Sequence, residues 1–212
     1  MLKPGDMLLG VLNFLAILVP GFVAIALIGL AKPNWVEPFI SSIATLTTVR
    51  EVAYAIAAYF VGQIAFLLGS ILDPVYGSVR KILSPADNTK AYDCVEKIRN
   101  SYLKLDAERA AVNPYQWSKA ILMAAAPTAA DDINRFEADS KFFRSLAVVS
   151  VAVAATQVCP QSEGYLLSAL IGALACFGGF YYWRTKCTTR AYLHIIALQR
   201  AGRLSKSEDV DA

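Results

Sequence analysis

Hydrophobic residues along this chain gather in four long runs, and polar or charged stretches separate them. The first run covers residues 7–30 and the second covers residues 52–72. Each is close to the ~20 apolar residues that an α-helix needs to cross a bilayer core. A helix satisfies its own backbone hydrogen bonds, so it is the form that such a run takes in lipid. The pattern predicts a first transmembrane pair within residues 1–73.

The second pair of runs begins with a helix that changes character along its length. Residues 128–143 mix charged positions with an apolar stripe, and the chain becomes apolar over residues 142–158. It turns at CPQSEG and returns as a fourth apolar run at residues 164–183. We expect one helix to rise into the bilayer and another to come back, so that residues 144–183 hold the second pair. The tail, residues 184–212, should continue as a helix with a disordered end.

Residues 74–143 form a charged insert between the two pairs, and their periodicity predicts helices. Apolar positions recur at spacings of four and three, as one face of a helix requires; they are Ala91, Val95, Ile98, Tyr102 and Leu105. Asn113-Pro114 should start the next helix, because Asn is a good N-cap and Pro suits the first helical position. Insert and tail together predict a small helical domain outside the membrane.

The fold class that follows is all-α: an integral membrane protein with four transmembrane helices and a small helical cytosolic domain. Of the 212 residues, 56% are hydrophobic and 17% are charged, against about 45–50% and about 25% in soluble domains. A net charge of +3 is too small to indicate nucleic-acid binding, and none is expected.

Basic residues predict the orientation of the chain. If the insert and both termini share one side, that side holds 18 of the 20 Lys and Arg residues, with Lys32 and Arg50 on the other. The positive-inside rule then places both termini in the cytosol, here of a bacterial inner membrane.

Several of these basic residues flank the predicted inner face of the membrane: Arg80, Lys81, Arg144, Arg184 and Lys186. They are candidates for binding anionic lipid headgroups, and the alternative is that they only set the topology. Arg144 would lie inside the short third run and extend its charge to the interface.

Three residues interrupt the first two runs: Asn13, Pro20 and Gln63. They suggest a hinge or a solute pathway. The alternatives are an ordinary proline kink at Pro20 and an interhelical hydrogen bond from Gln63.

Small residues mark two helix faces that allow close packing, within the chain or between protomers. Gly62 and Gly69 are seven residues apart in the second run. Ser168, Gly172 and Cys176 recur every four residues in the fourth run.

The sequence offers little catalytic chemistry. It has a single histidine, His194, and its four cysteines lack metal-ligand spacing, so neither a metal nor a cofactor is predicted. Glu51 and Asp73 mark the ends of the second run, and no acid lies in the middle of any run. We therefore expect no enzymatic activity.

The leading functional hypothesis is a non-enzymatic membrane protein. Its cytosolic helices would bind a protein partner or a signal, and its spans would form a homo-oligomer in the lipid. Small bacterial membrane effectors of defence or stress systems, including antiviral defence, use such a layout, which is an analogy only. A channel or solute-transport subunit is the first alternative, and a membrane-embedded enzyme is the second.

Overall fold

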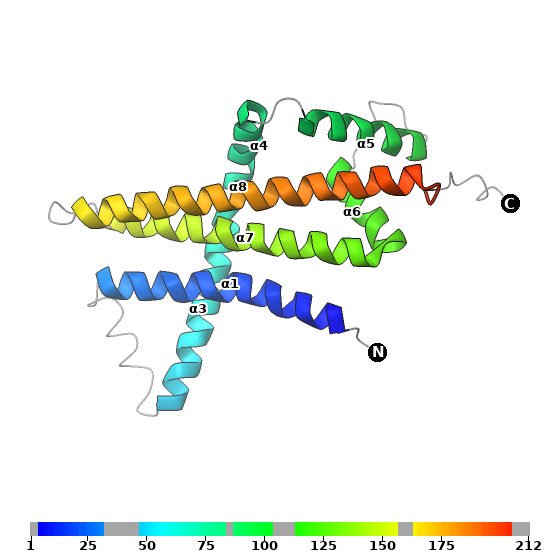
Figure 1. Cartoon of the computed structure of the whole chain (residues 1–212). Helices are drawn as coiled ribbons and strands as arrows, with labels where there is room; N and C mark the ends of the chain where they lie inside the picture. The colour runs from blue at the N-terminus through cyan, green and yellow to red at the C-terminus, as the bar shows by residue number, and fades with distance from the viewer. Residues whose placement is uncertain (1–3, 32–46, 84–86, 104–112, 157–162, 205–212) are drawn as a thin grey trace. The chain divides into compact units, whose positions relative to one another are not determined.

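The computed structural model describes residues 4–31, 47–83, 87–103, 113–156 and 163–204. Within these residues the chain forms seven helices and no strand (Figure 1), which confirms the all-α class for this part of the chain. Leu105, the turn before residue 163 and the end of the tail from residue 205 lie outside the described residues.

The helices follow one another as α1 (Pro4–Ala31), α3 (Thr47–Gly69), α4 (Leu72–Leu83), α5 (Asp87–Leu103), α6 (Pro114–Ala125), α7 (Pro127–Thr156) and α8 (Glu163–Arg200). Helix α8 continues without a break into the tail, as predicted. Contacts divide the chain into two units. Unit 1 is Met1–Tyr76 with Ala138–Trp183, and unit 2 is Gly77–Glu137 with Arg184–Ala212, so α4, α7 and α8 each contribute to both. The division into membrane pairs and a cytosolic insert stays a prediction.

Helices α1 and α3 pack against each other in unit 1 through glycines. A methyl group added to Gly21 of α1 would overlap the carbonyl oxygen of Ala58 and lie 2.8 Å from the amide nitrogen of Gly62. A methyl group added to Gly62 would overlap the carbonyl oxygen of Ile17. The two backbones therefore touch, as small residues permit. The apolar part of α7 joins them through Val149, within a cluster completed by Ala24, Ala65 and Val153.

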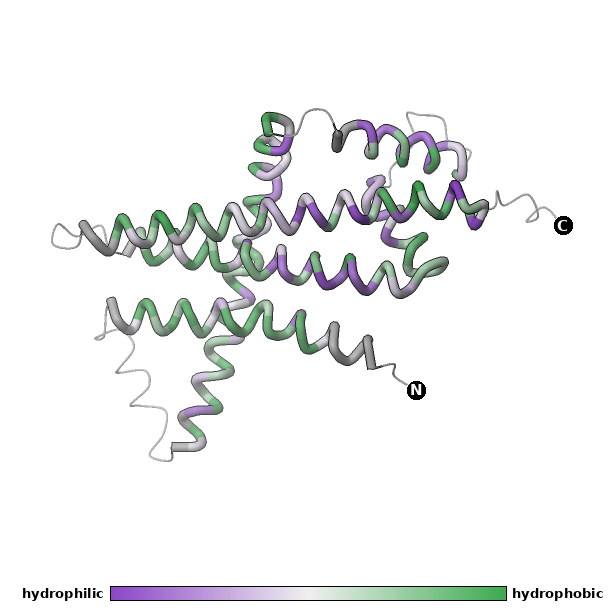
Figure 2. Tube along the Cα trace, viewed as in Figure 1, coloured by the Kyte–Doolittle hydropathy of each residue, from purple (hydrophilic) through white to green (hydrophobic). Residues whose placement is uncertain are grey.

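Three helices among the described residues are long and apolar enough to cross a membrane. The candidate spans are Gly10–Gly29 in α1, Glu51–Gly69 in α3 and Leu166–Arg200 in α8. The expected third run in α7 is not among them. The last 18 residues of α7, residues 139–156, hold three charged side chains, Asp139, Lys141 and Arg144, whereas each candidate span has an 18-residue stretch with at most two. Figure 2 shows α7 changing from mixed to mainly apolar along its length, whereas α8 changes from mainly apolar to mixed.

Unit 2 has a hydrophobic core of its own, built by α5, α6 and parts of α7 and α8. Its fully buried members include Val95, Leu122, Ile133 and Ile195. The predicted stripe on α5 is confirmed over its described residues, because Ala91, Val95, Ile98 and Tyr102 all pack into this core. Edge-on ring contacts, such as Tyr102 against Trp117 with centroids 5.9 Å apart, add specific geometry.

Candidate functional site

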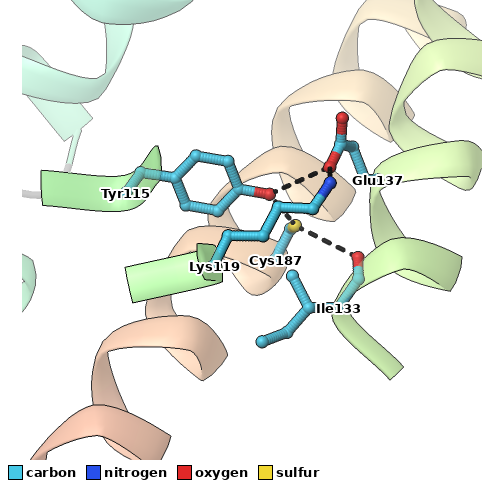
Figure 3. Close-up of polar contacts among 5 residues, drawn as sticks. All are labelled: Tyr115, Lys119, Ile133, Glu137 and Cys187. Atoms are coloured by element: carbon cyan, nitrogen blue, oxygen red, sulfur yellow. Dashed lines mark hydrogen bonds and ion pairs between the residues drawn. The ribbon is translucent and has the colours of Figure 1, made fainter. Parts of the chain in front are cut away.

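Polar side chains from three helices of unit 2 meet beside its core (Figure 3). Tyr115 of α6 donates its hydroxyl to Glu137 of α7 at 3.2 Å, and its oxygen lies 3.1 Å from the sulfur of Cys187 of α8. The Cys187 thiol also donates to the carbonyl of Ile133 at 3.4 Å. Lys119 forms an ion pair with the carboxylate oxygen of Glu137 that accepts the tyrosine hydroxyl. We call Tyr115, Lys119, Glu137 and Cys187 the polar cluster.

Local sequence explains how this cluster is assembled. Asn113 caps α6 by accepting from the amide of Tyr115 at 2.9 Å, which confirms the predicted start of this helix. Tyr115 and Lys119 then lie one turn apart on the same face, so both reach one carboxylate. Ile133 and Glu137 are likewise one turn apart on α7, and they present a carbonyl and a carboxylate to the same place.

Burial extends the pH range over which Tyr115 stays protonated. Loss of solvent raises the pKa of its phenol well above the ordinary value, and the neighbouring Cys187 and Glu137 raise it further. The guanidinium of Arg184, 5.3 Å from the centre of the ring, acts in the opposite direction. The phenol is therefore a neutral hydrogen-bond donor.

The chemistry of the polar cluster is that of a connection between helices. Cys187 is completely buried, so its thiol is closed to solutes. No group of three metal-binding side chains occurs in the described part of the chain. The cluster links α6, α7 and α8 by polar contacts that are mostly shielded from water.

Unit 1 holds a second charged site, centred on Arg144 of α7. Its guanidinium pairs with Asp73 of α4 at 2.8 Å and lies 5.0 Å from the centre of the Phe66 ring. A methyl group on Gly69 would approach this side chain to 3.1 Å, so the glycine makes room for it. Only 11% of the Arg144 side chain is exposed, because the carboxylate of Asp73 is within reach inside the unit. Its predicted binding to lipid headgroups stays a prediction.

The three predicted pathway residues have different surroundings. Asn13 is exposed on α1, whereas Pro20 lies inside α1 and is fully buried. Gln63 donates to the hydroxyl of Tyr59 at 2.8 Å, one turn earlier in the same helix. This bond lies within α3, and both the interhelical bond from Gln63 and its place in a pathway stay predictions.

The small-residue positions also differ from one another. Gly62 lies against the backbone of α1, while Gly69 lies against the Arg144 side chain. A methyl group on Gly172 would lie 3.7 Å from the hydroxyl of Ser150, so this part of α8 faces α7 of the same chain, whereas Ser168 is exposed.

Two of the predicted lipid-binding residues contact rings in unit 2. Arg184 covers Tyr115, and the amino group of Lys186 lies 4.8 Å from the centre of the Phe136 ring. Arg80 is partly exposed on α4, and the side chain of Lys81 lies outside the described residues.

Sequence reasoning missed Gly21 as a contact and missed the polar cluster. For Gly21 a signal existed, since a glycine in an apolar run permits close helix packing. For the cluster there was none, because its members are 22 and 72 residues apart.

No protein-family model matches this chain, and no curated protein or solved structure matches it.

Proposed function

We propose that this chain is a non-enzymatic multi-pass protein of a bacterial inner membrane. Its spans assemble as a homo-oligomer, and its cytosolic helical unit binds a protein partner or signal. The observation that carries the proposal is a contrast between the two units. Unit 2 closes around its own core, whereas less than a quarter of each candidate span is buried.

The exposed surface of the spans is strongly apolar. Leu67 of α3 is 65% exposed and Leu174 of α8 is 72% exposed, with Phe60 and Ile64 exposed beside the first. Soluble monomers rarely carry large apolar patches, because water contact with them is unfavourable. Lipid or further copies of the chain would cover this surface.

Four spans are proposed in place of the three candidates. The apolar part of α7 packs with α1 and α3 through Val149 and Val153, which supports its place beside them in the bilayer. Its ion pair from Arg144 to Asp73 reduces the cost of carrying a charge near the membrane. The fourth span would end near Trp183, because α8 beyond that residue contributes Ala191 to the core of unit 2.

The soluble unit supports a role in receiving a partner or signal. Helices α7 and α8 each belong to both units, so an event that repacks unit 2 acts on helices that also run through the spans. A membrane effector of a defence or stress system would use such a connection. This role follows from the layout alone.

Native mass spectrometry of the gently solubilised chain tests the proposal. A closed homo-oligomer, or a complex with a soluble protein, is the expected result. A monomer without any bound protein would contradict it. Fusions of a reporter to the C-terminus test the orientation, since a cytosolic terminus should give fluorescence from a fused fluorescent protein and no activity from a fused periplasmic phosphatase.

A further inference from the structure

Helix α4 begins where the span in α3 ends, with only Ser70 and Ile71 between them. Ile71 and two residues of α4 form an exposed apolar stripe. Ile71 is 66% exposed and Ile82 is 76% exposed, and Val75 is exposed as well. Val75 and Ile82 are seven residues apart on α4, so at about 100° per residue they lie within roughly 20° of each other around the helix axis, and Ile71 directly precedes the helix. The polar residues Asp73 and Arg80 lie on the opposite side.

Three contacts within unit 1 fix the first turn of α4 beside residues at the predicted membrane boundary. Asp73 pairs with Arg144, at the start of the apolar part of α7. The ring of Tyr76 lies 5.7 Å from that of Phe180 and 5.6 Å from that of Tyr181, measured between centroids. These two residues belong to the aromatic end of the α8 span, and such belts lie at the headgroup level.

We propose that α4 lies in the cytosolic interface of an anionic leaflet, with Ile71, Val75 and Ile82 at the boundary between headgroups and acyl chains. This inference rests on the proposed membrane function. The stripe is continuous with the end of a span, so lipid reaches it without further assembly. Arg80 and Lys81 follow on the same helix, and the acid Asp73 is already paired with Arg144. The sequence of α4 holds one acid, Asp73, and two basic residues, Arg80 and Lys81, so the helix has a net positive charge that complements an anionic leaflet.

Tryptophan quenching by lipids brominated near the headgroup tests this position in nanodiscs of the full chain. The test variant is Ile82→Trp. The matched control is Gly77→Trp on the same helix, about 140° away around its axis. A methyl group on Gly77 meets no atom within 4 Å, and Ile82 is largely exposed, so both variants should fold. Leu67→Trp reports whether the span in α3 is in lipid. The signal of the three native tryptophans is subtracted.

The expected result is strong loss of the added fluorescence in Ile82→Trp and little loss in Gly77→Trp. Adding Arg80→Gln, or replacing anionic by zwitterionic lipid, should reduce the loss. One cationic side chain near an anionic leaflet shifts such an equilibrium about fivefold.

Each other outcome overturns a defined part. Leu67→Trp without quenching would reject the proposed span, and the position of α4 with it. Quenching of Leu67→Trp but not of Ile82→Trp would reject only the position of α4. A second copy of the chain that covered the stripe would give this same result. Equal quenching of Ile82→Trp and Gly77→Trp would mean full immersion in lipid, and quenching that is independent of lipid charge would reject the anionic leaflet.

Discussion

Replacing Gly21 by alanine should separate α1 from α3, whereas the same replacement at Gly10 of α1 should not. The added methyl group at Gly21 would overlap the carbonyl oxygen of Ala58 and lie 2.8 Å from the amide nitrogen of Gly62. Both obstacles are backbone atoms of α3, which cannot rotate away as a side chain can. At Gly10 the methyl group would meet no atom within 4 Å.

The magnitude follows from overpacking at a contact that cannot relax locally. Extra methyl groups in well-packed regions cost about 1–3 kcal/mol, and alanine returns up to ~1 kcal/mol through its better helix propensity. For a chain of this size, each kcal/mol lowers Tm by about 2–4 °C. Gly21→Ala should therefore lower Tm by several degrees. The fall would reach about 12 °C if the helix propensity of alanine offset none of the overpacking cost. Gly10→Ala should leave Tm unchanged or raise it slightly.

Thermal unfolding in one detergent, followed by helical circular dichroism, measures both variants under the same conditions. Gly62→Ala should behave like Gly21→Ala, because its methyl group would overlap the carbonyl oxygen of Ile17. If Gly21→Ala melts at the same temperature as Gly10→Ala, the direct backbone contact between α1 and α3 does not exist and the reasoning fails.

Three further predictions concern the polar cluster of unit 2. Glu137→Gln removes the charged partner of Lys119 and should lower the free energy of unfolding, measured by denaturant titration, by about 1.5–3 kcal/mol. The double variant Glu137→Gln with Lys119→Met should lose less free energy of unfolding than the sum of the two single variants. Strictly additive losses would contradict the ion pair. Cys187 is buried, so a maleimide should label it only after unfolding, and peptide mass spectrometry that found it labelled in the native protein would oppose its burial. The pKa of Tyr115 is raised in the folded chain, while unfolded tyrosine ionises near pH ~10; stability should therefore be complete below that pH and fall above it. In denaturant titrations on both sides of that pH, Tyr115→Phe should show a smaller fall, and an equal fall in both proteins would exclude Tyr115 as its cause.

Local patterns in the sequence predicted the helices well. The cap at Asn113, the apolar stripe around Val95 and the uninterrupted tail helix of α8 all depend on residues within a few positions of one another. Hydrophobic periodicity and capping chemistry are local properties, so the chain itself expresses them. Of the four predicted apolar runs, three appear as candidate spans, because length and hydropathy need no knowledge of neighbours, and the run in α7 does not.

Tertiary structure decided which side chains meet. From the sequence, Arg144 was expected to extend its charge toward the lipid interface. In the structure it pairs with Asp73, which lies 71 residues earlier. Gly21 follows Pro20, where the sequence suggested a kink, and only the packing of α3 makes it a contact. Tyr115 reaches Cys187 across 72 residues. Pairings over such separations depend on how whole helices pack. The sequence around each partner would be the same whichever residue it met, so it carries no local signal for the pairing.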